Sequence, residues 1–225
     1  MQYKLILMDA DDTLLDFEAA EEKALSMLFD RYSLPSEAKI DYRRINSACW
    51  AAFERGEMTQ TELRKKRFVD FCSCRLPDED PSCAAAFYEH ALSLQSITLD
   101  GALYAVKEIS EKLPIAIVTN GIATIQRPRI TSSPIYPHIS SLLISEETGF
   151  QKPDPGMLLM ALEKYAVSPC EALMIGDSLS SDMQAAKQAG IDFLWYNPKG
   201  KARTSDAVIR YETKNIMDFV RISLS

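Results

Sequence analysis

Short apolar runs recur along the chain, and each of them ends at polar or glycine residues. Runs of this length, bounded by turn-forming residues, are typical of strands that are buried on both faces of a sheet. The runs predict strands at residues 5–8, 115–118, 142–144, 172–175 and 193–196. Because helical patterns separate most of these strands, we expect an α/β fold in which helices cover both faces of a parallel sheet.

Helical periodicity follows the strands in the second half of the chain. Apolar residues at spacings of three and four predict helices over residues 102–112, 155–165, 181–189 and 215–222. The segment after the second strand differs, because Pro128, Pro134 and Pro137 fall where a helix is expected. An interior proline costs a helix about 3 kcal/mol, so we expect a short or broken helix in this segment.

The region between the first two strands contains helical patterns and no strand signal. It predicts helices over about residues 17–32, 37–55, 60–72 and 82–93. Thr59 and Glu62 form a capping-box pattern at the start of the third helix. The second helix has an apolar inner face, which we expect to contain Ile40, Ile45, Ala48, Cys49, Ala52 and Phe53. We therefore predict two domains, a core of residues 1–15 and 97–225 and an inserted all-helical cap of residues 16–96.

Composition narrows the classes of protein to consider. The 225 residues carry a net charge of −7, which argues against a nucleic acid polymer as partner, because such binding needs a basic face. Five cysteines without a CxxC pair, beside two histidines, show no zinc-binding spacing and indicate reduced thiols. No apolar stretch approaches the ~18 residues of a membrane span, and no secretory signal is evident. We expect a cytoplasmic protein.

The strand at residues 5–8 leads directly into Asp9, Asp11 and Asp12. Ligands of open α/β sheets bind at the carboxyl ends of the strands, where this cluster falls. Crowded carboxylates repel one another, and a divalent cation relieves that repulsion. Hard oxygen ligands of this kind suit Mg²⁺. The alternative is a polar turn that caps the next helix.

Further polar residues follow other strands or their loops. Thr119 ends the second strand, Asp177 follows the fourth, Lys152 comes from a loop on the same side, and Asp182 follows shortly after Asp177. A hydroxyl, an ammonium and several carboxylates at one sheet edge fit phosphoryl transfer, in which positioning and charge neutralisation do most of the work. Taken singly, each has a plainer interpretation: a strand-end turn at Thr119, a solvated loop lysine at Lys152 and a helix first-turn acid at Asp182.

Together these segments resemble the four ordered motifs of the haloacid dehalogenase (HAD) superfamily of phosphohydrolases. The motifs are Asp9–Thr13, Thr119–Gly121, Lys152–Pro153 and Gly176–Asp177 with Asp182. The resemblance implies an HAD-like Rossmannoid parallel sheet, and the helical insert resembles the cap of the subgroup that carries its cap between the first two motifs. It implies a Mg²⁺-dependent phosphoric monoester hydrolase whose partner is a small-molecule phosphomonoester.

The resemblance also implies a role for each motif residue. Asp9 resembles the nucleophile that becomes an aspartyl-phosphate, and Asp11 resembles the general acid and base. Asp9, the backbone carbonyl of Asp11 and Asp177 resemble the ligands of Mg²⁺. Thr119 and the backbone N–H of Asn120 resemble the groups that bind the phosphate. Lys152 resembles the cation that neutralises Asp9 and the phosphate oxygens, and Asp182 resembles its support.

Parts of the insert and one core loop are similar to bacterial pyrimidine 5′-nucleotidases. The similar segments are Ile45–Trp50, Phe53–Gly56, Thr59, Leu63, Arg67–Phe68 and Ser145–Pro153. This similarity implies a pyrimidine nucleoside monophosphate as substrate. Trp50 and Arg67 are candidates for substrate contact by stacking on a base and by pairing with a carbonyl or phosphate. The plainer interpretation is a packing tryptophan and a surface arginine. Pro128 departs from the uninterrupted helix of the relatives.

Other functions stay open at this point. A phosphatase for small sugar or hydroxy-acid phosphates would use the same scaffold. A phosphomutase is disfavoured because nothing marks a second phosphate site, and a dehalogenase is disfavoured by Asp11, Lys152 and Asp177 together. From another class, a non-catalytic regulatory protein could share the fold, although all the motif residues are present. The oligomeric state is not indicated by the sequence.

Overall fold

The computed structural model describes residues 3–225 apart from the side chain of Glu54, and it divides into two compact units. The first, here the core unit, comprises Met1–Phe17 and Ser96–Ser225. The second, here the helical unit, comprises Glu18–Gln95. No described helix is both long and apolar enough to cross a membrane.

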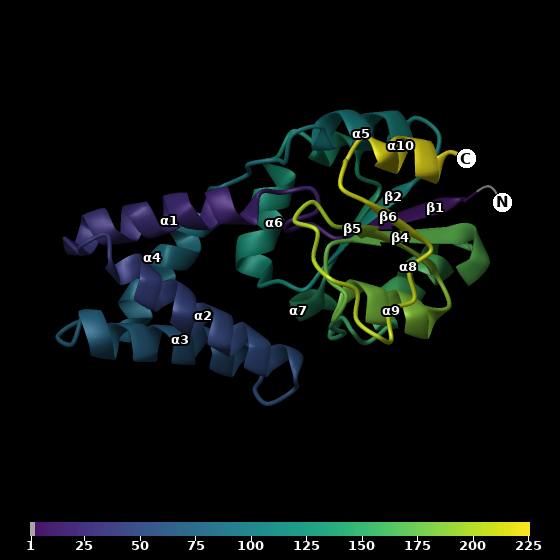
Figure 1. Cartoon of the computed structure of the whole chain (residues 1–225). Coiled ribbons are helices and arrows are strands. Elements are labelled where there is room, and N and C mark those ends of the chain that lie inside the picture. Colours follow the sequence, from purple (N-terminus) through teal and green to yellow (C-terminus); the bar gives the residue numbers. More distant parts are fainter. Residues whose placement is uncertain (1–2) are drawn as a thin grey trace. The chain divides into compact units, whose positions relative to one another are not determined.

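A parallel sheet forms the centre of the core unit (Figure 1). Within residues 3–225 its strands are β1 (Leu5–Met8), β2 (Ile115–Thr119), β3 (Ser141–Ile144), β4 (Ala172–Gly176), β5 (Asp192–Tyr196) and β6 (Tyr211–Thr213). Their order is β3-β2-β1-β4-β5-β6, and every neighbouring pair is parallel. The chain therefore winds outward from β1 in both directions, which makes the carboxyl end of β1 the topological switch point where ligands of such sheets bind.

Helices cover both faces of this sheet, as Figure 1 shows. The helices of the core unit are α5 (Ala102–Ser110), α6 (Ala123–Thr131), α7 (Ser145–Thr148), α8 (Gly156–Tyr165), α9 (Asp182–Ala189) and α10 (Asp218–Ser223). Short 3₁₀ turns occupy Tyr136–His138 and Pro169–Glu171. Residues of α5 and α10 belong to one buried apolar cluster, and residues of α8 and α9 belong to the other. The predicted α/β fold with a parallel sheet is confirmed.

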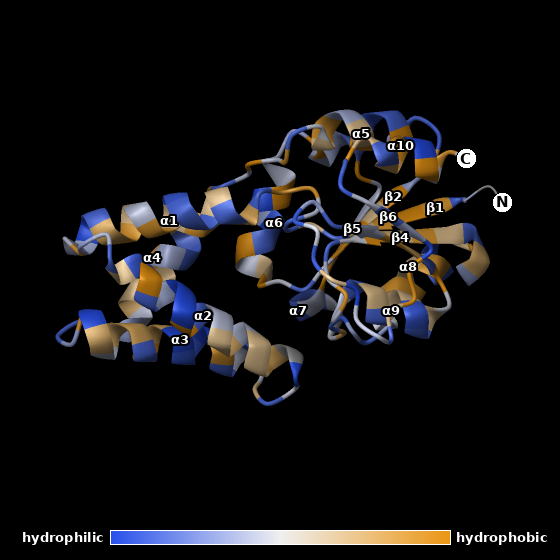
Figure 2. Ribbon diagram, viewed as in Figure 1, coloured by the Kyte–Doolittle hydropathy of each residue, from blue (hydrophilic) through white to orange (hydrophobic). Residues whose placement is uncertain are grey.

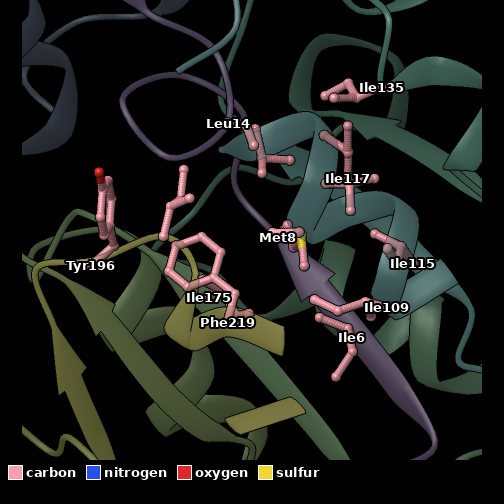
Figure 3. Packing of buried hydrophobic residues seen from close by; sticks show 14 of the residues in the cluster. Ile6, Met8, Leu14, Ile109, Ile115, Ile117, Ile135, Ile175, Tyr196 and Phe219 are labelled. Carbon is pink, nitrogen blue, oxygen red and sulfur yellow. The ribbon is translucent and has the colours of Figure 1, made fainter. Parts of the chain in front are cut away.

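Strand β1 is buried on both faces because its alternate side chains enter different clusters. Ile6 and Met8 pack with α5 and α10, as Figure 3 shows for the residues around Met8. Leu5 and Leu7 point to the opposite face and pack with α8 and α9. Strand β1 is accordingly coloured as an apolar segment in Figure 2. A strand without a solvated face has a fixed register, so the residue after Met8 is held at the end of the sheet.

The helical unit contains most of α1 (Phe17–Tyr32), together with α2 (Ala38–Glu54), α3 (Gln60–Arg75) and α4 (Pro81–Ser93). The predicted capping box is present, because the Thr59 side chain accepts from the backbone of Glu62 while the Glu62 side chain accepts from that of Thr59. The core of this unit is aromatic, and its rings lie 5.1–6.2 Å apart: Phe29, Tyr42, Phe68, Phe71 and Tyr88.

The predicted inner face of α2 needs a correction. Ile40 is 70% exposed and Ala48 is also exposed, whereas Tyr42 is fully buried. The buried residues Tyr42, Ile45 and Cys49 follow helical spacings of three and four. Ile40 lies five residues before Ile45 and therefore falls on another side of the helix.

Two other features of the core unit differ from the sequence pattern. Strand β6 was not predicted, because its three residues pair along one side only and leave Glu212 exposed. Helix α6 is short, as expected, but it continues through Pro128 to Thr131. Its backbone resumes the helical pattern after the proline, since the Ser132 N–H donates to the Pro128 carbonyl.

Candidate active site

The candidate site begins where β1 ends. Asp9 follows Met8, and its backbone N–H donates to the Ile175 carbonyl of β4 at 2.9 Å. This bond extends the ladder by one residue and fixes the Asp9 backbone between β2 and β4. The residue is only 8% exposed. The sheet therefore presents one oriented carboxylate at its switch point.

Lys152 supplies the charge that makes a buried Asp9 tolerable. The ammonium group has three N–H donors, and three acceptors surround it: Asp9 Oδ1 at 2.6 Å, Asp182 Oδ1 at 2.6 Å and the Val118 carbonyl at 2.8 Å. The side chain is 1% exposed. A buried ammonium needs this degree of pairing, because an unpaired charge in the interior is strongly unfavourable. Lys152 is thus a fixed cation of the site.

Asp182, the first residue of α9, supports Lys152. Its Oδ2 accepts from the Ser178 N–H at 3.1 Å, while its Oδ1 accepts from Lys152. The carboxylate packs directly on Gly176, where an added Cβ would lie 2.3 Å from Asp182 Oδ2. Gly176 is therefore a glycine because the close approach of Asp182 leaves no room for a side chain.

Asn120 holds the loop that carries Lys152. Its Oδ1 accepts from the Lys152 N–H at 2.8 Å, and its Nδ2 donates to the Lys152 carbonyl at 2.6 Å. The side chain thus pairs with both backbone groups of the lysine. Thr119, at the end of β2, is buried, and its Oγ1 accepts from Gln126 Nε2 at 3.1 Å. The turn after β2 positions both a hydroxyl and the lysine loop.

An acidic cluster lies at the same edge. Asp9, Asp177 and Asp182 each offer a carboxylate oxygen within 4.8 Å of the others. Both oxygens of Asp182 already accept hydrogen bonds, so Asp9 and Asp177 are better suited to be direct ligands of a cation. Asp177 also forms an ion pair with Lys201 at 3.1 Å. Carboxylate oxygens are the ligands that Mg²⁺ prefers, so the residues fit this ion.

Burial and like charge act on the carboxyl groups of this cluster. Burial raises the pKa of Asp9 above its usual range, and the neighbouring Lys152 opposes that rise. Burial also raises the pKa of Asp177, with Asp182 adding to the effect and Lys201 opposing it. A bound dication would favour the ionised forms in the same way as the two lysines do.

The side chain of Asp11 lies apart from this acidic cluster. Its carboxylate forms an ion pair with Arg129 at 2.8 Å and accepts from Gln126 Nε2 at 2.6 Å. Sequence reasoning did not find Gln126 and Arg129, since both lie on the helix that the prolines made doubtful. The role predicted for Asp11 in metal binding uses its backbone carbonyl and is compatible with this side-chain position.

The two residues predicted to contact substrate from the insert lie in the helical unit. Arg67 is 3% exposed, with Asn46 and Glu89 each at 3.4 Å, and its guanidinium lies against the rings of Phe68 and Tyr88. Trp50 is half-buried, with its ring edge-on to Phe53. The plainer interpretation of Arg67 placed it on the surface, whereas the described side chain is buried. The substrate contacts stay a prediction.

A cavity of about 550 Å³ lies within the helical unit between α3 and α4. Phe68, Ala85 and Glu89 contribute to its wall. None of the predicted catalytic, metal-binding or substrate-binding residues is among the described residues that form the wall. Two of its wall residues, Phe68 and Glu89, are nevertheless neighbours of Arg67.

Comparison with known families decides the class of protein. A family model described as haloacid dehalogenase-like hydrolase matches residues 3–190. The chain belongs to the haloacid dehalogenase-like hydrolases.

Relatives within this family are similar over nearly the whole chain. YfnB from Bacillus subtilis, named as an HAD-hydrolase, is 33% identical over 224 residues, which are 98% of this chain and 95% of YfnB. PynA from Streptococcus pneumoniae, named a pyrimidine 5′-nucleotidase, is 35% identical over 98% of this chain and 94% of its own. YjjG from Escherichia coli, with the same description, is 30% identical over 96% of this chain and 99% of its own.

A solved structure extends the comparison to three dimensions. The crystal structure of YfnB bound to magnesium has a TM-score of 0.92 and 32% identity, and the match covers 99% of each chain. HAD hydrolases generally depend on magnesium. The predicted family and the HAD-like fold are confirmed, the chain is a hydrolase, and its relatives support the phosphoric monoester class.

Proposed function

We propose that this HAD hydrolase is a Mg²⁺-dependent phosphomonoesterase that works through an aspartyl-phosphate on Asp9, and that pyrimidine nucleoside 5′-monophosphates are its substrates. The observation that carries the proposal is the three-way coordination of Lys152 by Asp9, Asp182 and the Val118 carbonyl at the switch point of the sheet. A carboxylate can attack an anionic phosphate there because buried positive charge offsets the repulsion.

Binding is assigned to groups at the ends of β1, β2 and β4. Asp9 and Asp177 would hold Mg²⁺ together with the Asp11 carbonyl, and the bound ion would supply positive charge to the phosphate oxygens. The Thr119 hydroxyl and the Asn120 backbone N–H would donate to the same oxygens. Lys152 fixes the orientation of Asp9 through Oδ1 and adds a second positive charge.

The reaction then has two halves. In the first, an Asp9 oxygen bonds to phosphorus, the ester P–O bond breaks, and Asp11 donates a proton to the departing oxygen. In the second, Asp11 takes a proton from water, the water oxygen bonds to phosphorus, and the bond between Asp9 and phosphorus breaks. The products are the free alcohol and inorganic phosphate, and the enzyme returns to its starting form.

The nucleotide part of the proposal rests on relatives and on the helical unit. PynA and YjjG are named pyrimidine 5′-nucleotidases and match nearly the full length of the chain. We propose that the helical unit is the cap domain and supplies substrate contacts through Trp50 and Arg67. Trp50 is the more accessible of the two, because Arg67 is buried against its own neighbours.

A substrate panel with the purified chain tests the function. We expect release of phosphate from UMP, dUMP and dTMP with Mg²⁺ and loss of activity with a chelator. AMP, GMP, phosphoglycolate and glucose 6-phosphate should be poorer substrates. Preference for phosphoglycolate or the sugar phosphate would overturn the nucleotide assignment and leave the phosphatase, whereas inactivity on the whole panel would overturn both.

Matched variants connect the activity to the residues. Asp9→Asn should lose at least about 10³-fold in kcat, while the exposed Asp100→Asn should keep wild-type activity. Asp177→Asn should weaken Mg²⁺ binding in calorimetry. Trp50→Leu should raise KM for UMP without raising KM for phosphoglycolate. An active Asp9→Asn variant would remove Asp9 from the nucleophile role.

A further inference from the structure

A buried group of polar side chains connects Asp11 to helix α6. Gln126 and Arg129 lie three positions apart on α6, so they share one face of the helix. Their side chains are 3% and 1% exposed, respectively. The proposed chemistry gives neither residue a task, although burying an amide and a guanidinium is costly unless both are well paired.

The Gln126 amide lies between two groups of the proposed reaction. Its Nε2 donates one hydrogen to Asp11 Oδ2 at 2.6 Å and the other to Thr119 Oγ1 at 3.1 Å. Its Oε1 accepts from Arg129 Nη1 at 2.8 Å. This orientation of the amide is chemically determined, because the opposite one would set its oxygen against the Asp11 carboxylate and its NH₂ against the guanidinium.

Arg129 fixes the other oxygen of Asp11. Its Nη1 lies 2.8 Å from Asp11 Oδ1, and its guanidinium lies over the Phe17 ring at 5.6 Å from the centroid. Both carboxylate oxygens of Asp11 therefore contact groups on α6. Rotation of the Asp11 side chain would require the loss of the ion pair and of the hydrogen bond together.

The turn after β2 is shaped to admit Gln126. An added Cβ at Gly121 would lie 2.1 Å from Gln126 Cγ and 3.0 Å from its Cδ. The glycine of the Thr119–Gly121 motif thus provides the space through which Gln126 reaches Thr119 and Asp11. This close packing leaves the amide little freedom.

We propose that Gln126 and Arg129 are positioning residues of the phosphatase reaction, holding the acid–base carboxyl of Asp11 at a set distance from the phosphate-binding hydroxyl of Thr119. The proposal rests on the proposed function and goes beyond it by assigning a task to α6. Misplacing a reacting group by about 1 Å can cost about 10²-fold in rate. Loss of either residue should therefore act mainly through Asp11.

The dependence of kcat/KM on the leaving group distinguishes a positioning residue from a residue that only stabilises the fold. Departure of phenol from phenyl phosphate needs a proton from Asp11, whereas p-nitrophenolate departs from p-nitrophenyl phosphate with little assistance. For Arg129→Met we expect kcat/KM to fall about 10²-fold on phenyl phosphate and less than about 10-fold on p-nitrophenyl phosphate. Gln126→Met should widen the same ratio and add a loss common to both substrates through Thr119. An equal loss on both substrates for Arg129→Met would overturn the proposal.

A double-mutant cycle tests whether the effect passes through Asp11. On phenyl phosphate, where Arg129→Met alone should cost about 10²-fold, adding it to Asp11→Asn should lower kcat/KM by no more than about 3-fold, because the group being positioned is already disabled. A loss in that background as large as in the wild type would overturn the assignment. Arg127→Met is the matched control on the same helix, since Arg127 is exposed and pairs with Glu147 at the surface, and it should keep activity within about 2-fold.

Separate controls test whether the variants fold and whether the proposed phosphatase function holds. Arg129→Lys keeps the charge and loses the planar fork, so it should fold even where Arg129→Met is destabilised, and it should show the same leaving-group trend. A crystal structure of Gln126→Met should show Asp11 in a changed side-chain conformation, and an unchanged Asp11 would count against the proposal. A wild-type chain that hydrolyses neither UMP nor either aryl phosphate with Mg²⁺ overturns the proposed function itself, whereas an active wild type with leaving-group-independent variants overturns this inference only.

Discussion

Lys152 and Asp9 show at the scale of single residues how chemistry and stability depend on each other. Lys152 donates to two carboxylates and one carbonyl in a site that water barely reaches. Breaking a buried ion pair leaves an uncompensated charge and costs more than the pair contributes. The ammonium that would offset repulsion in the proposed reaction therefore also permits Asp9 and Asp182 to be buried side by side.

We predict that Lys152→Met abolishes phosphatase activity and lowers the free energy of unfolding by about 3–5 kcal/mol. The loss should be smaller when Mg²⁺ is present, since the ion would neutralise Asp9. Urea denaturation with and without Mg²⁺ measures both effects. The exposed Lys112→Met variant is the control and should change the stability by less than about 0.5 kcal/mol. Unchanged stability of Lys152→Met would contradict the paired role of this lysine.

Single residues at strand ends were largely predictable, and residues on helices were not. Asp9, Thr119 and Asp177 follow apolar runs, so their position at one sheet edge follows from the parallel arrangement. Gln126 and Arg129 have no such marker, because a buried polar residue on a helix looks like a surface residue in a single sequence. Their contacts with Asp11 depend on how α6 packs, which local patterns do not encode.

Helix α6 shows the same limits at the scale of one element. The prolines of its segment predicted a short or broken helix, and α6 is nine residues long but continuous through Pro128. Tertiary contacts outweigh the local cost, since Ile125, Gln126, Arg129 and Ile130 are all buried. Strand β6 was missed for the opposite reason, because the local pattern was too weak rather than misleading. Its three residues are too few to show an alternation of apolar and polar positions.

Replacing the proline should stabilise this helix. Pro128→Ala restores an N–H that can donate to the carbonyl four residues earlier, and we expect the free energy of unfolding to rise by about 1–2 kcal/mol after the greater freedom of the unfolded chain is subtracted. Pro134→Ala, at an exposed turn, should instead lose up to about 1 kcal/mol. Thermal and urea denaturation measure both. A less stable Pro128→Ala variant would show that the proline ring contributes packing that outweighs the helix term.

Glu21 on α1 gives a prediction for the pH dependence of stability. Burial raises its pKa above the ordinary glutamate value of 4.5, and the nearby Arg43 opposes the rise. The folded chain therefore binds this proton more tightly than the unfolded chain, so the contribution of Glu21 to stability falls as pH rises above about 4.5. Gln does not titrate. The stability of Glu21→Gln relative to wild type should therefore increase between pH 4 and pH 7 in urea denaturation, and a difference that stays constant or decreases would contradict this account.

The whole molecule combines an α/β core unit with an inserted helical unit. The site residues of the core unit are spread over the sequence from Asp9 to Asp182. The parallel strand order brings them to one edge of the sheet, because the strands around β1 all end there. The fold class and the family could be predicted because many apolar runs and four separate motifs agree. Substrate choice could not be derived in the same way, since the residues proposed to contact the substrate, such as Trp50, have ordinary packing roles as well.

The central claim is that phosphate passes through Asp9, and trapping the labelled enzyme tests it most directly. The chain is mixed with Mg²⁺ and with the ³²P-labelled form of the substrate that it hydrolyses fastest. The reaction is quenched in acid within one turnover, and the labelled peptide is then mapped. We predict at most one phosphate per chain, on the peptide that contains Asp9, and no label on Asp9→Asn or without Mg²⁺. Full turnover with no label on the protein, or label at another residue, would contradict the account.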